Sequence, residues 1–268
     1  MIMRSQQAAA KIRALSLRLV HKAQASHIGS ALSIADLLAV LIADDCLCNL
    51  PKYDDPLRDR IFLSKGHACV ALYSALCLKG FFSEEEVMTY GEDFSPFMNH
   101  ASHYVPGVEM STGALGHALP VACGRAYAAK LKKEDWHTFV IMSDGELQEG
   151  SNWEALMFAA HHSLNNLTIC IDYNNLQSLD TVDNTLSLSP LSDKLSSFGW
   201  KPHVVDGHNH ASLAAALYES KASNLPSAVI MNTCKGKGVS YMERSVAWHY
   251  KSPNDSQLAE ALREVLEQ

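Results

Sequence analysis

The sequence lacks several features that would place it in a special class at once. Its 268 residues contain no run of about 18 apolar residues, so no transmembrane helix is expected. Basic residues are in the minority, 22 against 29 acidic ones, and the net charge of −7 argues against a nucleic-acid partner. Low-complexity tracts and Gly/Ser/Pro linkers are absent, which excludes a disordered chain. What remains is a folded protein of one large or two small domains.

The cysteines form no paired motif. There are seven, an odd number, and no Cys-x-x-Cys occurs. Cys46 and Cys48 are closer together than in the usual zinc knuckle, and Cys170 lies inside an apolar run. A zinc ribbon or disulfide framework is therefore not expected. We predict unpaired cysteines packed in the interior of a protein from a reduced, cytoplasmic compartment.

The first 35 residues contain no Asp or Glu but carry five basic residues, which is typical of an organellar transit peptide. Apolar residues at helical spacing, Ile12, Leu15, Leu19 and Ala23, indicate a core helix instead. A motif that can carry chemistry begins directly afterwards, at His27. For that reason we favour the helix.

Helical and strand patterns alternate along the chain. Helices are predicted over about 5–25, 33–44, 67–79, 116–132, 151–163, 211–222 and 255–267, and strands over 138–142, 167–172, 203–206 and 227–233. The strands at 138–142 and 167–172 are almost continuously apolar, as in a parallel sheet covered on both faces. The predicted fold class is therefore α/β, a doubly wound, mostly parallel sheet with helices on both faces. In such folds ligands bind at the carboxyl ends of the strands.

Polar residues follow two successive predicted strands. Asp144-Gly145 comes after the first and Asn174-Asn175 after the second, and Asp144 and Asn174 lie 30 residues apart. One loop, one crossover helix and one strand have this length, so both side chains should meet at one edge of the sheet. A carboxylate and an amide oxygen suit Mg²⁺ or Ca²⁺ that completes its shell with phosphate oxygens and water. Gly145 leaves room for a phosphate, although turn formation and helix capping are common alternative roles for Asp and Asn.

Asp144-Gly145 and Asn174-Asn175 together resemble the GDG-x-NN signature of thiamine-diphosphate enzymes, with Ser143 in place of the first Gly. Four further segments resemble, in order, motifs of transketolases: Ser26-His27-Ile28-Gly29-Ser30, Ser64-Lys65-Gly66-His67, residues 106–116 and Trp248-His249. The resemblance covers about residues 5–253 and only the diphosphate-binding domain of that family. It implies that residues 1–268 form a single diphosphate-binding domain, the N-terminal subunit of a split transketolase. The pyrimidine-binding and C-terminal domains would belong to a separate subunit, in a heterotetramer.

The same resemblance implies roles for individual residues. The metal would be held by Asp144, Asn174 and the carbonyl of Leu176. Thiamine diphosphate would be contacted by His67, Gly113, Leu115, Gly145, Asn174 and His249. The substrate channel and reacting centre would be lined by His27, His100 and His249, and Glu149 would lie at the subunit interface, near the partner's activating glutamate.

Histidine suits such a site because ketol transfer moves protons near neutral pH, where imidazole titrates. His100 lies in Asn-His-Ala where the family has Gly-His-Pro, so His103 is an alternative to it. The histidines outside the matched motifs, His161, His162, His208 and His210, are expected on helix faces or in loops.

Departures from the family pattern bear on the substrate. Tyr250 stands where split relatives have Gly, and His117-Ala118 replaces Gln-Gly. The lysines of Lys235-Gly236-Lys237-Gly238 could meet a phosphate or sulfonate, although solvated charges are more usual in such loops. A sugar phosphate or a sulfonated sugar is the implied substrate, and the sequence does not choose between them.

The activity implied by the resemblance is transfer of a two-carbon ketol unit from a ketose to an aldose, with thiamine diphosphate and Mg²⁺ or Ca²⁺. The chain is expected to be inactive without its partner. Alternatives are a component of a deoxyxylulose-phosphate-synthase-like enzyme and a non-catalytic regulatory homologue. A nucleotide-dependent Rossmann enzyme is disfavoured, because neither G-x-G-x-x-G nor G-x-x-x-x-G-K-[ST] occurs.

Overall fold

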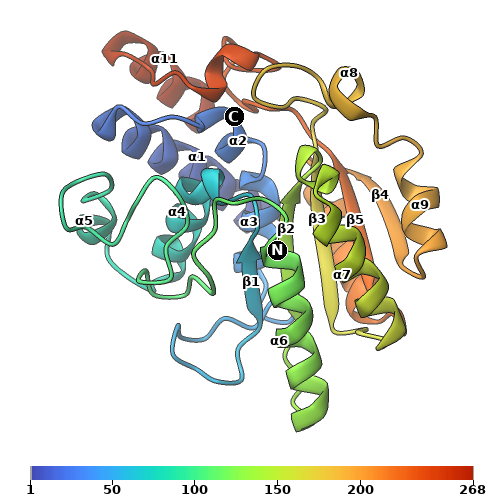
Figure 1. Cartoon of the computed structure of the whole chain (residues 1–268). Helices are drawn as coiled ribbons and strands as arrows, with labels where there is room; N and C mark the ends of the chain where they lie inside the picture. The colour runs from blue at the N-terminus through green and yellow to red at the C-terminus, as the bar shows by residue number, and fades with distance from the viewer. Residues whose placement is uncertain (1, 268) are drawn as a thin grey trace.

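A five-stranded parallel sheet forms the centre of the protein (Figure 1). The computed structural model describes residues 2–267. The strands lie in the order β1-β2-β3-β5-β4, and each neighbouring pair is parallel. Their carboxyl ends therefore meet at one edge, here called the carboxyl edge, where the following loops can share a site. The strands are Arg60–Leu63 (β1), Thr138–Ser143 (β2), Leu167–Tyr173 (β3), Lys201–Asp206 (β4) and Ser227–Asn232 (β5).

Helices surround this sheet. The α-helices of the described chain are Ile2–Ala23 (α1), Ile28–Leu32 (α2), Ala35–Ala43 (α3), Cys69–Lys79 (α4), Glu84–Val87 (α5), Ala118–Lys132 (α6), Gly150–His161 (α7), Val182–Leu186 (α8), Leu191–Ser197 (α9), His210–Lys221 (α10) and Asp255–Leu266 (α11). Short 3-10 turns span Gly66–Ala68, Gly145–Gln148 and Val246–His249. Each of these turns carries a residue of a motif described above.

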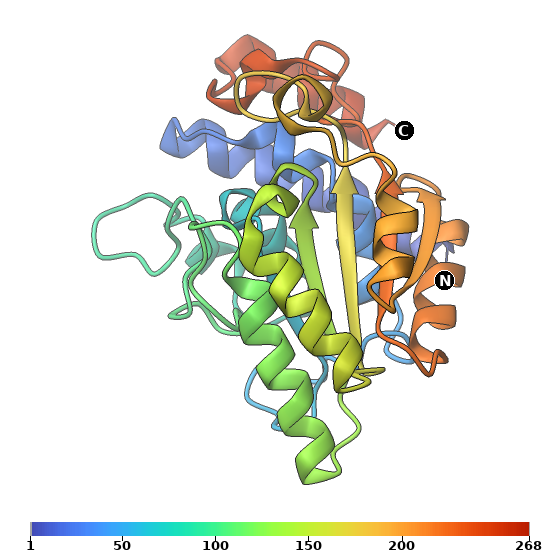
Figure 2. The same cartoon turned by 45° about the vertical axis from the view of Figure 1, so that its right-hand side comes forward.

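Alternate strand residues face two separate apolar layers. In β2, Phe139 and Ile141 pack with α1, α3, α4 and α10, whereas Val140 and Met142 pack with α6, α7 and α9. All four side chains are fully buried. Period-two alternation puts consecutive residues on opposite faces, and both faces are covered, which explains why the strands are apolar throughout. Figures 1 and 2 show α6 and α7 across the near face of the sheet, with α1 and α3 on the far side.

The predicted fold class is confirmed, and each predicted helix and strand is present with bounds that differ by a few residues. The prediction missed β1 and the short helices α2, α5, α8 and α9. Strand β1 has only four residues and begins with Arg60, so its apolar run is too short to indicate a strand.

Helix α1 occupies the acid-free N-terminal stretch, as predicted. Ile12, Leu15 and Leu19 are buried, and the helix contacts α3, α4 and α11. Arg13 is buried as well and forms an ion pair with Asp36 of α3, with 2.5 Å between Nη2 and Oδ2. These residues therefore belong to the core. No helix in residues 2–267 has the length and apolar character needed to cross a bilayer.

All seven cysteines are free. Cys48, Cys69, Cys123 and Cys170 are buried, as predicted, whereas Cys46 is exposed and that part of the prediction is wrong. Burial raises the pKa of the Cys170 thiol to about 12, which keeps it protonated and unreactive at neutral pH.

Candidate functional site at the carboxyl edge

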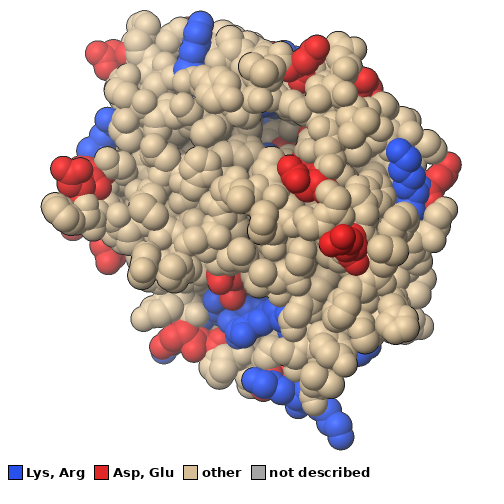
Figure 3. All heavy atoms as spheres, viewed as in Figure 1, with Lys and Arg blue, Asp and Glu red and all other residues tan. Residues whose placement is uncertain are grey.

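A cavity of about 250 Å³ opens at the carboxyl edge, among the loops that follow β1, β2, β3 and β5. Figure 3 shows a hollow in this face with basic atoms visible inside it. The structure brings together in its lining every predicted site residue except Glu149: His27, His67, His100, Gly113, Leu115, Asp144, Gly145, Asn174, Leu176 and His249.

Asp144 is buried directly after β2 and is oriented by two backbone N–H groups. Its Oδ1 accepts from Gly145 N–H at 2.7 Å and its Oδ2 from Asn175 N–H at 2.6 Å. Burial, and then the nearby Asp172 carboxylate, raises the pKa of Asp144 to about 6. No ion pair to Asp144 occurs within residues 2–267. An oriented carboxylate with no cation of its own is suited to bind a divalent metal.

Two more oxygen donors come from the loop after β3. Asn174 Oδ1 accepts from Leu176 N–H at 3.0 Å, and the Leu176 carbonyl accepts from Lys235 Nζ at 3.2 Å. Each carbonyl oxygen has a second lone pair, so these bonds leave an acceptor position free. Carboxylate, amide and carbonyl oxygens form the hard donor set that Mg²⁺ and Ca²⁺ prefer. The residues present therefore fit the predicted metal.

A buried ion pair that the sequence did not predict lies beside these donors. Asp172 of β3 is fully buried, and Lys65 Nζ lies 2.5 Å from its Oδ2. Asp172 also accepts hydrogen bonds from the Ser33 and Thr233 hydroxyls and from Asn174 Nδ2. Burial alone would raise the pKa of Asp172, but Lys65 and these hydrogen bonds outweigh it and lower the pKa. The pair thus ties together the loops after β1, β3 and β5.

Lys235, in the loop after β5, is buried as well. Its Nζ donates to the carbonyls of Leu176 and Gln177 and lies 2.9 Å from His249 Nδ1. The expectation of solvated lysines is wrong for Lys235, which is 2 % exposed, and correct for Lys237, whose side chain is 37 % exposed. Burial, and then Lys65, lowers the pKa of Lys235 to about 8. Since Lys65 is already paired with Asp172, Lys235 is the ammonium group of this wall whose charge favours an anionic ligand.

Four histidine rings surround the cavity. The ring centre of His27 lies 5.4 Å from that of His67, 5.6 Å from that of His100 and 5.0 Å from that of His249. Burial is the largest cause that lowers the pKa of His27 to about 4, of His249 to about 3 and of His67 well below its usual range. For His27, His67 and His249 the expectation that imidazole titrates near neutral pH is wrong, because their lowered pKa values keep these three rings neutral at pH 7. A neutral ring acts as one hydrogen-bond donor and one acceptor.

Local backbone geometry fixes two of these rings. His27 has a φ of 72°, in the left-handed region that is costly for a residue with a side chain, and its N–H donates to the His249 carbonyl at 2.7 Å. A Cβ on Gly113 would lie 3.1 Å from the His100 ring, so glycine at this position lets the backbone around residue 113 pack against that ring. His103 is exposed, contacts Ser111 and does not line the cavity, so His100 is the one of the two that does.

Two glutamates that follow Asp144 lie in different surroundings. Glu149 directly precedes α7, makes no side-chain capping bond, is exposed and lies outside the cavity lining, so its predicted place at the subunit interface stays a prediction. Glu146, which the sequence did not single out, is fully buried, and its Oε1 accepts from the Ser64 hydroxyl at 2.5 Å and from Gly116 N–H at 3.0 Å. Glu146 therefore joins the loops on both sides of the cavity.

Comparison with known proteins identifies relatives of this chain. Residues 4–265 match the family described as the thiamine diphosphate binding domain of transketolase. An apulose-4-phosphate transketolase subunit from Phocaeicola vulgatus is 41 % identical, and the match covers 96 % of this chain and 92 % of that protein. The 6-deoxy-6-sulfo-D-fructose transketolase subunit SqwG of Clostridium sp. (strain MSTE9) is 38 % identical over 89 % of this chain and 87 % of that protein.

Among solved structures, transketolase from Campylobacter jejuni superposes with a TM-score of 0.92 at 30 % identity. The superposition covers 99 % of this chain but only 43 % of that one. The chain thus has nearly the length of the two bacterial transketolase subunits and spans less than half of the Campylobacter jejuni chain.

Proposed function

Because the chain belongs to the transketolase family of thiamine diphosphate binding domains and has nearly the length of its separate bacterial subunits, we propose that it is the N-terminal subunit of a split transketolase that transfers a two-carbon ketol unit from a ketose to an aldose. One observation carries the proposal. Asp144 is a buried carboxylate with a raised pKa, and it shares a cavity with the Asn174 and Leu176 oxygens and with two lysines. In this proposal residues 1–268 are one diphosphate-binding domain.

Different cavity residues would bind the metal ion and the thiamine diphosphate. Asp144, Asn174 and the Leu176 carbonyl would hold Mg²⁺ or Ca²⁺ against the diphosphate. Thiamine diphosphate would be contacted by His67, Gly113, Leu115, Gly145, Asn174 and His249. When bound, it supplies the nucleophilic carbon and the electron sink for the transferred unit.

The histidines of the cavity would orient the sugar and exchange protons with its hydroxyls. Lys235 donates to His249 Nδ1, so the proton of neutral His249 is on Nε2, from which it can be donated. His27 and His100 border the same cavity and would line the path of the substrate. Because burial keeps both rings neutral, His249 can donate a hydrogen bond from Nε2 to a sugar hydroxyl, and His27 can accept one at its unprotonated nitrogen.

A separate subunit with the pyrimidine-binding and C-terminal domains is the proposed partner, in a heterotetramer. The surface around the hollow in Figure 3 carries few charges, as expected for the core of an interface. Leu179 and Tyr250, 85 and 59 % exposed, present apolar surface next to or within the cavity lining. Exposed Glu149 is placed at this interface by the proposal. Seven free cysteines are in keeping with a cytoplasmic location.

The proposed substrate carries a phosphate or a sulfonate. The relatives are named for apulose 4-phosphate and for 6-deoxy-6-sulfo-D-fructose. Both anions match a cavity wall that contains Lys65 and Lys235. Tyr250, which borders the cavity, would narrow the acceptor side of the channel.

The decisive experiment uses the chain together with its partner subunit. Calorimetric titration with thiamine diphosphate should show binding that requires Mg²⁺, and ketol transfer should appear in the complex and in neither polypeptide by itself. Activity of the isolated chain would refute the split arrangement. Mg²⁺-dependent binding without ketol transfer to any aldose would instead favour the non-catalytic homologue. The absence of binding to the complex would overturn the site.

A further inference from the structure

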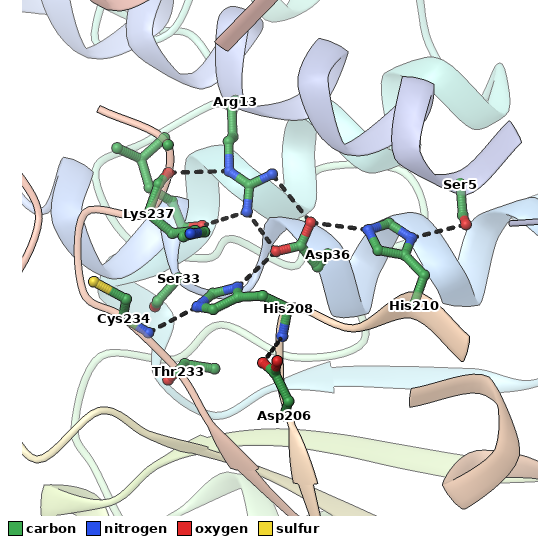
Figure 4. A network of polar contacts seen from close by, with 12 residues as sticks. Ser5, Arg13, Ser33, Asp36, Asp206, His208, His210, Thr233, Cys234 and Lys237 are labelled. Carbon is green, nitrogen blue, oxygen red and sulfur yellow. Dashed lines mark hydrogen bonds and ion pairs between the residues drawn. The ribbon is translucent and has the colours of Figure 1, made fainter. Parts of the chain in front are cut away.

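A second buried polar cluster lies outside the cavity and is centred on Asp36 of α3 (Figure 4). Arg13 contacts both carboxylate oxygens of Asp36, at 3.0 and 2.5 Å. His208 Nδ1 lies 2.7 Å from Oδ2, and His210 Nε2 lies 3.0 Å from Oδ1. Burial would raise the pKa of Asp36, but Arg13 and the two histidines outweigh it and hold the pKa well below its usual range. A charged Asp36 therefore anchors three side chains, Arg13 from α1 and two histidines from the segment that leads from β4 into α10.

His208 connects this cluster to the loop after β5. Its Nε2 accepts the backbone N–H of Cys234 at 2.8 Å. A backbone N–H can only donate, so Nε2 carries no proton and Nδ1 donates to Asp36, which selects one neutral tautomer. The hydroxyl of Thr233, one residue earlier, donates to Asp172. Two buried aspartates thus hold consecutive residues of one loop, Asp172 directly and Asp36 through His208.

The loop held in this way continues into the cavity. Lys235 follows Cys234 directly and places Nζ against His249 Nδ1. The N–H of Gly236 donates to the carbonyl of Gly29 at 2.9 Å, and Gly29 lies two residues after His27 in the chain. At the far end of the loop, Arg13 Nε donates to the Lys237 carbonyl at 3.1 Å. Both ends of the segment that carries Lys235 are therefore fixed by residues that contact Asp36.

From this geometry we propose that His208 is a positioning residue for the cavity: by bridging Asp36 to the Cys234 N–H, it holds Lys235 against His249. His208 does not line the cavity and acts only through the loop. The effect on cofactor binding rests on the proposed function, whereas the effect on the loop does not. Loss of the bridge should therefore loosen residues 233–238 and weaken thiamine diphosphate binding without unfolding the sheet.

His210 provides a matched control. Like His208, it makes one contact with Asp36, but its other ring nitrogen contacts the Ser5 hydroxyl in α1, at 2.8 Å. His208→Ala and His210→Ala each remove one partner of the same carboxylate. Only His208→Ala also leaves the Cys234 N–H without its acceptor. If the cluster had only a structural role, the two variants would show the same exchange in residues 233–238 and the same cofactor affinity.

Two measurements on each variant test the proposal, both with the chain and its partner subunit. In hydrogen exchange followed by mass spectrometry, His208→Ala should speed exchange in peptides covering 233–238 about tenfold, with His210→Ala close to wild type there. Titration with thiamine diphosphate and Mg²⁺ should show affinity about tenfold weaker for His208→Ala only. His208→Gln, whose side-chain amide offers an NH₂ donor and an oxygen acceptor, should recover most of both effects.

Equal exchange in the 233–238 peptides of the two alanine variants would overturn the proposal, as would a His208→Gln variant no better than His208→Ala. If His208→Ala does not fold, His208→Phe and His210→Phe replace the pair, since phenylalanine keeps the ring volume and removes the polar contacts. If wild type does not bind thiamine diphosphate, the proposed function fails, and the exchange data alone still decide the role of His208.

Discussion

Two aspartates lie at the carboxyl ends of neighbouring strands, and the protein neutralises the charge of only one of them. Asp172 of β3 is fully buried beside Lys65, and the net effect lowers its pKa. Asp144, which follows β2, is 2 % exposed, has no ion pair among the described residues, and has a pKa raised to about 6. The difference is whether the chain supplies the cation. The carboxylate of Asp172 is neutralised by Lys65, whereas in the proposed function that of Asp144 would be neutralised by a bound divalent cation.

The largest effect is expected from removing Lys65, the cation that pairs with Asp172. Lys65→Met should lower the free energy of unfolding by about 3–5 kcal/mol, because it leaves a buried carboxylate uncompensated. Denaturant unfolding at pH 7 measures the loss. Lys22→Met is the control: Lys22 pairs with Glu92 at the surface, and its loss should cost less than about 1 kcal/mol. Similar losses in both variants would contradict the structural role of Lys65.

The second prediction concerns the cation that Asp144 lacks. With thiamine diphosphate present, Mg²⁺ at about 100 times its dissociation constant should stabilise the complex of chain and partner by about 2.7 kcal/mol, and Asp144→Asn should abolish this gain. Thermal unfolding with and without Mg²⁺ measures it. Glu154→Gln removes an exposed carboxylate outside the cavity lining and should keep the full gain. A normal Mg²⁺ response of Asp144→Asn would exclude Asp144 as a ligand.

A third buried ionisable residue, His137, lies directly before β2, at the amino end of the strand. Burial, and then Lys221, lowers the pKa of His137 from 6.5 to about 3. As the pH falls below 6.5, the unfolded chain binds a proton that the folded chain does not. The stability that His137 gives above pH 6.5 is therefore lost on acidification, by about 2 kcal/mol between pH 7 and pH 5.

Unfolding measured at both pH values should accordingly show a smaller acid loss in His137→Gln than in wild type. Exposed His161 supplies the control, since His161→Gln should leave the loss unchanged. Identical acid losses in all three proteins would show that His137 is not held neutral.

The smallest effect is expected where no charge is involved. Tyr250 is 59 % exposed, so Tyr250→Gly should change the free energy of unfolding by less than about 0.5 kcal/mol and leave cofactor affinity unchanged. The ratio of ketol-transfer rates with different aldoses should nevertheless shift, because the side chain borders the cavity. Tyr104→Gly, at an exposed tyrosine outside the cavity lining, should alter neither quantity. Unchanged rate ratios in Tyr250→Gly would remove Tyr250 from the substrate path.

The meeting of Asp144 and Asn174 could be predicted because the spacing within one βαβ unit determines where two strand ends lie. The burial of Lys65 could not, since its partner Asp172 is 107 residues away and β1 itself was too short to predict. His208 is similar: its contact with Asp36 spans 172 residues. Local patterns thus predicted the elements and brought the candidate metal donors together. The counter-charges depend on which strands become neighbours, and sequence periodicity does not contain that information.

The packing of α1 against α11 has a consequence for the newly made chain. His21 contacts Asp255 and the Pro253 carbonyl, and Ser252 donates to the Val20 carbonyl. At a synthesis rate of about 5–20 residues per second, the ribosome releases α11 roughly 10–50 s after α1. Throughout that delay part of the apolar surface of α1 faces solvent. One face of α1 is covered by α11, so the burial of α1 is complete only once the ribosome has synthesised α11.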